Sequence, residues 1–460
     1  MIVKFSKMLT AITEILNQNA STEVDVCMTS EMARRIELWT AMYENRAPWA
    51  DQKIVKSAQL PATIASEIAR LVTLEMKSEI TGSVSAEYLN KQYQEKVLSG
   101  LRRYVEYGCA KGGLILKPYV TKNGLTIQYV QADSFFPLAF DDSGRIQQCA
   151  FVEQFRKGKK IYTRLEVHEL QGEHIRITNR AFVATNDYNL GSEISMKAVE
   201  RWSELEPEAV LAGADRLLFG YFRVPLANAD DTDSPLGVSV YSRAPELIEE
   251  ADRRYSNICW EYDGTQLAIH IATSLLKYNR DMDKFDYPGG KDRLYRNVEY
   301  NSGATDKPFI EVFSPEIRDT ALFNGFNNQL KLVEFACCLA YGTLSDPQNV
   351  DKTATEIKTS KQRSYTFVSD TQQALQKALE DLVYAMNFWA VLYGLIPPAD
   401  YQVSFDWDDS IIVDAEAERQ TDRADVAMGV MSLAEYRSKW YGETLEEAQK
   451  NLPEPADVEE

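Results

Sequence analysis

The sequence is poor in the residues and motifs from which active sites are commonly built. Its 460 residues include only three histidines, His168, His174 and His270, too few for a histidine-rich metal site. The six cysteines form no CxxC pair, which favours buried free thiols in a reducing compartment over a disulfide framework. There is no GxxxxGK(S/T) phosphate loop, GxSxG elbow or HExxH motif. We therefore predict no catalytic residue, no metal and no cofactor.

Long apolar runs are also missing. No uncharged stretch approaches the roughly 18 apolar residues that cross a bilayer. At the N-terminus, Lys4, Lys7 and Glu14 interrupt the apolar positions, so no signal peptide is predicted. We expect a soluble protein without a membrane partner that is synthesised in the cytoplasm.

Positive charge is scarce relative to negative charge. The chain carries 50 Lys and Arg against 69 Asp and Glu, a net charge of −19. Residues 400–460 alone hold 17 acids and 5 bases, a net charge of −12. Because phosphate neutralisation supplies most of the affinity of non-specific DNA binding, this chain is not expected to hold DNA tightly. Any nucleic acid that it handles is expected to be tolerated rather than bound tightly.

The rest of the composition is that of an ordinary folded protein, and the length predicts about three structural units. Apolar residues recur at helical spacing over residues 1–110. Over residues 112–185 the pattern alternates, with turn signals such as Asn123-Gly124 and Asp142-Ser143-Gly144, which predicts an antiparallel meander. Residues 186–235 are polar and are expected to be irregular.

Helical spacing returns after residue 240. A helix with Pro245 in its first turn is predicted over 244–262, with charged residues that include Asp252 on its outer face. A mixed segment follows over 263–313. Ser314-Pro315-Glu316 then predicts the start of a second helix, whose apolar residues occupy several sides, so that it should be buried from more than one direction.

A polar loop separates that helix from a third one. Gly342 is expected to end the helix, and Thr353-x-x-Glu356 is a capping box for the next. The loop between them, Gly342 to Lys352, has eleven residues. The third helix should run to Pro397-Pro398, before a short strand, YQVSFDW.

The chain ends in two short predicted helices, each with a capping box, at Ser432/Glu435 and Thr444/Glu447. The predicted fold class is therefore α+β and mainly helical.

Two functions stay open from the residues alone. Asp406, Asp408 and Asp409 are clustered carboxylates that could hold Mg²⁺ in a metal-dependent nuclease, although an acidic turn after a strand has the same pattern. The several-sided helix also fits a helical scaffold or adaptor that oligomerises without a channel.

Five stretches carry a family resemblance, in register over nearly the whole chain. They are Trp39-x-x-x-Tyr43 with Ala47-Pro48-Trp49, LPATIASEIARLVTLE (60–75), YGCAKGGLILKPYV (107–120), SPLGVSVYSRAPELIEEADRRYSN (234–257) and FSPEIRDTALFNGFNNQLKLVEFACCLAYGTLSDPQNVDKTATEIKTSKQRSY (313–365). Together they resemble the portal (connector) proteins of long-tailed bacteriophages and prophages of Gram-positive bacteria. The last stretch is the strongest.

The resemblance implies a portal-like fold with named parts. These parts are a wing (1–243, with the β-meander at about 112–185), a stem helix pair (244–262 and 314–341), a mixed α/β clip (263–313), a tunnel loop (342–352), C-terminal wing helices (353–413), and a small helical crown with the acidic tail (414–460).

The resemblance also implies roles for particular residues. The tunnel loop would face DNA through Ser345, Asp346, Gln348, Asn349, Asp351 and Lys352. The clip would dock partners through Lys277, Arg280, Lys291 and Arg293. The stem helices would carry Glu249, Glu250, Arg253, Arg254, Gln329 and Lys331.

The implied function is a non-enzymatic ring, usually of twelve subunits, at one capsid vertex. Double-stranded DNA would pass through it without sequence specificity during packaging and ejection. The implied partners are the ATP-driven terminase large subunit, head-completion or adaptor proteins, and the major capsid and scaffolding proteins. The protein would be assembled in the host cytoplasm and reside in the virion.

Overall fold

The computed structural model describes residues 5–19, 28–51, 53–187, 189–232, 234–272, 276–280, 284–286, 294–298, 310–346, 354–407 and 415–452. The described structure is α+β with more helix than strand, which confirms the predicted fold class. Within these residues, no helix combines the length and the apolar character needed to cross a membrane.

The helices are α1 (Phe5–Asn19), α2 (Ser30–Tyr43), α3 (Leu60–Thr73), α4 (Val84–Lys96), α5 (Leu101–Lys111), α6 (Pro245–Gly264), α7 (Asp319–Ala336), α8 (Ala354–Leu392), α9 (Ala415–Ala427), α10 (Leu433–Tyr441) and α11 (Leu445–Lys450). The longer strands are β1 (Met76–Thr81), β2 (Gly113–Thr121), β3 (Gly124–Gln131), β4 (Phe135–Phe140), β5 (Ile146–Lys157), β6 (Lys160–Gln171), β7 (His174–Ala184), β9 (Glu208–Ala212), β11 (Ala268–Ala272) and β16 (Gln402–Trp407). The shorter strands are β8 (Ser192–Ile194), β10 (Gly220–Arg223), β12 (Lys277–Asn279), β13 (Lys284–Asp286), β14 (Tyr295–Val298) and β15 (Ile310–Phe313).

The predicted meander is divided between two antiparallel sheets. β4 to β8 pair in chain order, and β9 pairs with β7. β2 and β3 form a separate sheet with β10. In the β2–β3 hairpin Thr121 pairs with Gly124, so the loop residues are Lys122 and Asn123, and Gly124 begins β3 with a φ of +92°. Strands β8, β9 and β10 lie within residues 186–235, so the prediction that this segment is irregular is only partly right.

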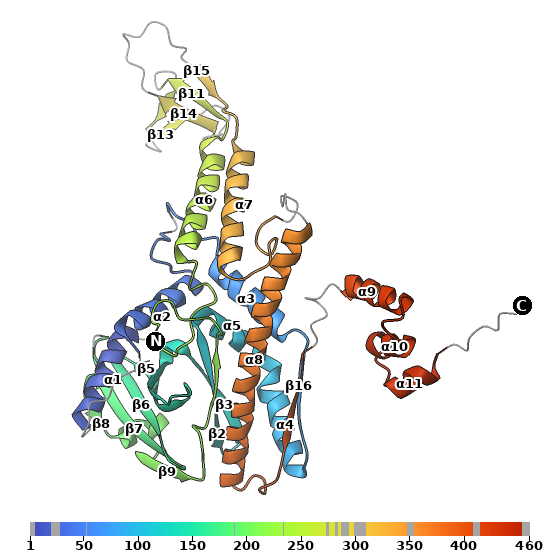
Figure 1. Cartoon of the computed structure of the whole chain (residues 1–460). Helices are drawn as coiled ribbons and strands as arrows, with labels where there is room; N and C mark the ends of the chain where they lie inside the picture. The colour runs from blue at the N-terminus through green and yellow to red at the C-terminus, as the bar shows by residue number, and fades with distance from the viewer. Residues whose placement is uncertain are drawn as a thin grey trace, which may run out of the picture.

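Helix α8 runs through the largest hydrophobic core (Figure 1). Its side chains Leu375, Leu379, Leu382 and Met386 are fully buried, and it packs on β10, β2 and α3. Strand β10 approaches α8 so closely that a Cβ on Gly220 would lie 2.0 Å from the carbonyl oxygen of Ala378. A side chain at this position would therefore push the sheet away from the helix.

Helices α6 and α7 extend side by side away from this core, with the small sheet β14-β11-β15 at their far end (Figure 1). Gln329 of α7 donates to the carbonyl oxygen of Leu247 on α6 (3.0 Å), and Arg254 of α6 donates to that of Gly325 on α7 (3.1 Å). The three helices α9, α10 and α11 pack on one another and stand beside the rest of the chain (Figure 1). Both predicted capping boxes are present in α10 and α11.

Two helix predictions need correction. Residues 76–81, predicted within a helical region, form β1, which pairs with β16 from the far end of the chain. Helix α7 begins at Asp319 rather than at Ser314. The reason is Glu261 on α6, whose carboxylate accepts hydrogen bonds from the backbone and guanidinium of Arg318 and so draws the chain away from helical geometry.

The end of α7 also differs from the prediction. The helix ends at Ala336, so the adjacent cysteines Cys337 and Cys338 lie in the turn that follows it. Cys338 has a left-handed φ of +57°. Gly342, the predicted end of the helix, lies six positions beyond its last residue.

The segment between α2 and α3 is fastened to α6 on the side opposite α7. Asp252 accepts hydrogen bonds from the indole of Trp49 (2.9 Å) and from the backbone of Ala58 (2.8 Å). Ser256 Oγ accepts a third from the backbone of Lys56 (2.8 Å). Asp252 is 1% exposed, which corrects its predicted place on the outer face, and burial raises the pKa of its carboxyl.

A cluster of buried charges lies where β2 faces β6. Glu166 accepts from Lys117 (2.7 Å), Arg164 (2.9 Å) and His168 Nε2 (2.6 Å). Burial favours the neutral form of Glu166, but the attraction of Lys117, followed by His168 and Arg164, prevails and holds the pKa of Glu166 well below its usual value. Burial lowers the pKa of His168, and its Nδ1 has no hydrogen-bond partner. Both observations fit a neutral ring whose Nε2–H donates to Glu166.

This cluster predicts a loss of stability in acid. The folded protein resists protonation of His168, whereas the unfolded chain accepts that proton below about pH 6.5, so stability should fall as the pH drops through this value. Glu166 should add to the loss below about pH 4.5, its ordinary value. We expect His168→Gln, which keeps a donor to Glu166, to flatten the change in the thermal unfolding midpoint between pH 7.5 and 5. The same substitution at the exposed His174 should leave this pH dependence unchanged. An equal change of the unfolding midpoint with pH in both variants would contradict the role of His168.

Candidate functional site

The connection between α7 and α8 contains the predicted DNA-facing residues. The structure describes it as far as Asp346, which is exposed. Ser345 is only 4% exposed and its hydroxyl donates to Glu334 (2.9 Å), so its side chain is engaged by α7, and its role towards DNA stays a prediction. The other predicted loop residues, Gln348, Asn349, Asp351 and Lys352, lie outside the described residues.

Residues 344–346 fold back onto α7 through side chains of that helix. Glu334 is fully buried, and its Oε1 accepts from the backbone N–H groups of Leu344 (2.6 Å) and Ser345 (2.8 Å). Asn327 Oδ1 accepts from the backbone N–H of Asp346 (2.7 Å). No sequence pattern identified either residue, and the only signal was that Glu334 is an acid set among apolar positions near the end of the helix.

Helix α8 is tied to the same turn through Arg363. One guanidinium nitrogen donates to the carbonyl oxygen of Leu339 (3.1 Å). The guanidinium carbon lies 4.6 Å from the centre of the Phe335 ring and 5.6 Å from that of Tyr341. Arg363 therefore combines a hydrogen bond with two cation–π contacts.

The residues predicted on the helix pair have different environments. Glu249 pairs with Arg253 (2.6 Å) and Glu250 with Arg254 (3.0 Å) along the surface of α6, and such exposed pairs contribute little stability. Gln329 is buried and joins the two helices, as does Arg254. Lys331 is partly buried on α7.

Two of the four predicted partner-docking residues, Lys277 and Arg280, lie at the far end of the helix pair. Lys277 is in β12, which pairs with β13, and Arg280 follows β12 with an exposed side chain. Lys291 and Arg293 lie outside the described residues. The structure thus brings Lys277 and Arg280 to one hairpin and places neither near Asp346.

Large apolar side chains are exposed along both helices. Trp260 on α6 is 74% exposed, and Phe323, Leu332 and Phe335 on α7 are 48%, 52% and 57% exposed. The predicted several-sided apolar character of α7 is therefore present, and in a single chain its outer sides are uncovered. Apolar surface of this kind on a folded protein marks an interaction surface.

The alternative metal site has little support in the described residues. Asp406 is exposed on β16, and Asp408 and Asp409 lie outside the described part. Among the residues that the structure describes, no three His, Cys, Asp or Glu side chains are grouped to hold a metal ion.

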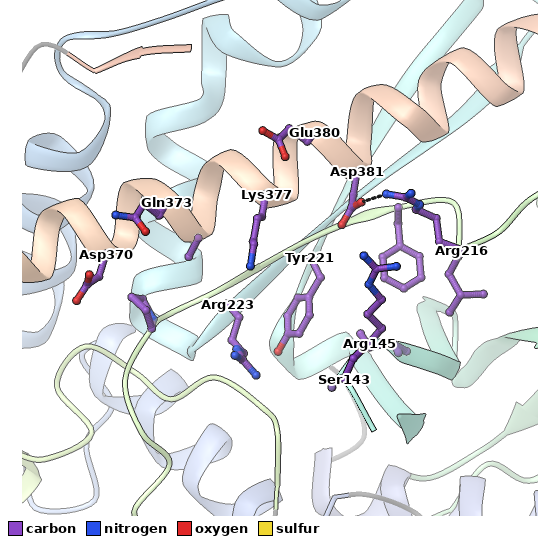
Figure 2. A pocket seen from close by; sticks show the side chains of 16 residues that line it. Ser143, Arg145, Arg216, Tyr221, Arg223, Asp370, Gln373, Lys377, Glu380 and Asp381 are labelled. Atoms are coloured by element: carbon purple, nitrogen blue, oxygen red, sulfur yellow. Dashed lines mark hydrogen bonds and ion pairs between the residues drawn. The ribbon is translucent and has the colours of Figure 1, made fainter. Parts of the chain in front are cut away.

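A groove of about 710 Å³ lies between α8, β10 and the β4–β5 turn (Figure 2). Arg145, Arg223 and Lys377 line it together with Asp370 and Asp381. Arg216 pairs with Asp381 (2.9 Å), which ties β10's preceding loop to α8. The mixed charges of this groove give no clear preference for one ligand. No sequence pattern could have indicated the groove, because its walls come from three segments that are distant in the chain.

Comparison with known proteins identifies the family. The model of the family "Phage portal protein, SPP1 Gp6-like" matches residues 33–455. No curated protein matches. A solved chain from the "Neck of native GTA particle computed with C12 symmetry" is similar in structure, with a TM-score of 0.41 and 12% identity, covering 83% of this chain and 90% of that chain.

The assignment rests on the family model, because its match extends over nearly the whole length of the 460-residue chain. The buried cores, the projecting helix pair and the predicted fold class accord with that match. The chain belongs to the SPP1 Gp6-like family of phage portal proteins.

Proposed function

We propose that identical copies of this chain, expected to number twelve, close into a ring at one vertex of a phage capsid, and that double-stranded DNA passes through the ring during packaging and ejection. The family match over residues 33–455 is the observation that carries this proposal. In this proposal the protein is a conduit rather than an enzyme, and a partner ATPase supplies the energy.

The parts of the chain receive their roles from this proposal. Residues 1–243 and 353–413 form the wing, residues 244–262 and 314–341 the stem that contains most of α6 and all of α7, and residues 263–313 the clip. Residues 342–352 are the tunnel loop, and residues 414–460 the crown and acidic tail. The projection of α6 and α7 from the main core, with a small sheet at their far end, supports this division (Figure 1).

The charge of the chain suits a passage through which DNA slides. Each strong phosphate contact adds affinity, so a channel wall needs few of them. The net charge of −19 and the exposed Asp346 supply a wall that repels DNA mildly. Specific base recognition is not needed for this role.

The exposed apolar residues on α6 and α7 support contacts between copies. In a ring the same two surfaces of every subunit meet repeatedly, so an apolar flank on each subunit is covered by its neighbour. Burial of each large apolar side chain contributes about 1.5–3 kcal/mol.

Arg280 and the β12–β13 hairpin lie at the end of the helix pair, where the clip would project. We propose this end as the docking surface for the terminase large subunit during DNA entry and for head-completion proteins afterwards. The major capsid and scaffolding proteins would surround the wing. The exposure of Arg280 supports its availability for such contacts.

The second candidate function is an oligomeric capsid adaptor without a channel, favoured by the same apolar exposure. Particle images distinguish the two, because a portal seen end-on has a central hole. Incubation with DNA and Mg²⁺ tests the alternative of a nuclease that uses Asp406, Asp408 and Asp409. The portal proposal predicts no cleavage of the DNA.

The first prediction of this proposal concerns the channel charge. Asp346→Lys combined with Asp351→Lys should leave rings intact and lower the amount of DNA packaged several-fold, because the added cations bind phosphates. The matched control is Asp142→Lys with Glu173→Lys, two exposed acids at sheet hairpins. DNA per particle is measured for each, and normal packaging by the loop variant would contradict the loop assignment.

The second prediction concerns assembly. Leu332→Asp with Trp260→Asp should weaken the ring, because two charges would have to be buried between copies. The mass of the purified assembly should shift towards single subunits while the unfolding temperature of the chain changes little. Val84→Asp with Val210→Asp, at positions 82% and 60% exposed elsewhere, is the control. Rings of unchanged mass in the stem variant would argue against this interface.

A further inference from the structure

The exposed acid Asp346 is the last of three successive residues whose backbone is fixed to α7. The backbone N–H groups of Leu344, Ser345 and Asp346 each donate to a side-chain oxygen of α7, at 2.6, 2.8 and 2.7 Å. The Ser345 hydroxyl donates to the second carboxylate oxygen of Glu334 and accepts from the backbone of Gly342 (3.2 Å). Three consecutive backbone donors are therefore satisfied by two side chains.

Loss of these hydrogen bonds would cost substantial free energy. Glu334 is 0% exposed and Asn327 is 8% exposed, so water could not readily take the place of either side chain as a hydrogen-bond acceptor. A buried charge without partners costs several kcal/mol, whereas three donors compensate the Glu334 carboxylate. The acid is thus stable in this place only when residues 344 and 345 keep their position.

Helix α8 approaches the same turn from the other side. Arg363 binds the carbonyl oxygen of Leu339 and lies against Phe335, the residue next to Glu334 in the sequence. The turn between α7 and Asp346 is therefore held by both helices that the connection joins. The position of the Asp346 backbone relative to both helices is therefore defined.

We propose that Glu334 and Asn327 are positioning residues for Asp346, fixing where its carboxylate stands relative to passing DNA. The inference rests on the proposed function, because that function makes Asp346 a channel-facing acid. Glu334 would not touch DNA and would act only through the segment that it binds. Within the proposed tunnel loop, 342–352, the part available to face DNA would accordingly begin at Asp346.

Hydrogen exchange in the assembled full-length protein tests the attachment without DNA. Glu334→Ala should speed exchange of the Leu344 and Ser345 amides by about tenfold or more, because both lose a charged acceptor. Glu334→Gln should have a smaller effect, because its amide oxygen can still accept from both. Gln329→Ala is the matched control, since Gln329 is buried on the same helix but binds α6. Unchanged exchange in Glu334→Ala would overturn the proposal.

Asn327 provides a second variant should Glu334→Ala fail to fold. Asn327→Ala should speed exchange of the Asp346 amide alone, and Asn327→Asp, which keeps an oxygen acceptor, should restore slow exchange. An Asp346 amide that exchanges equally in all three proteins would overturn the role of Asn327.

A double-mutant cycle tests the action through Asp346. Glu334→Ala should lower the amount of DNA packaged several-fold in the native background and by less than twofold in an Asp346→Ala background. The same fold-loss in both backgrounds would overturn the positioning role. Normal packaging by Asp346→Ala alone would overturn it as well. Failure of the portal function itself is seen separately, as absence of a ring with a central hole in particle images.

Discussion

The packing of α8 is the constraint on which the rest of the structure depends. One helix of 39 residues is buried against strands of two sheets and against α3, and its position fixes elements that are far apart in the sequence. Gly220 lets β10 approach it, and β16 returns from its end to pair with β1. Because α8 cannot move without disrupting this core, Arg363, which donates from α8 to Leu339, has a defined position as well. The turn after α7 is therefore held by α7 and by α8.

The sequence predicted what depends on local pattern. The helical stripes of α6 and α8, the Pro245 start and both C-terminal capping boxes follow from residues within a few turns, and each is present. The pairing of β1 with β16 was not predictable in this way, because the partner strand lies about 320 residues away. The late start of α7 depends on Glu261, a side chain of another helix. Long-range contacts overrode good local signals in both cases.

The candidate site shows the same division. A run of polar residues after Gly342 predicted a loop, but it gave no means to separate Ser345, which is buried, from Asp346, which is exposed. Glu334 produces this difference in burial. Its position in an apolar stretch did not indicate which residues it would bind. Only the fold brings the carboxylate to three donors that lie ten and eleven residues further along the chain.

Acidic side chains therefore serve two opposite purposes in this protein. Glu334, Glu166 and Asp252 are buried, and each is held by donors that compensate the lost hydration, so these acids specify the positions of backbone segments and strands. The exposed acids contribute to the net charge of −19 and oppose close approach of other copies of the chain and of any polyanion. Copies of such a chain can associate only where apolar contact outweighs that repulsion, and salt screens the repulsion without weakening the apolar term. The exposed Trp260, Leu332 and Phe335 on an otherwise acidic molecule meet this requirement. In the proposed ring, α6 and α7 would therefore supply the cohesion between copies, and the acidic surfaces would remain solvated.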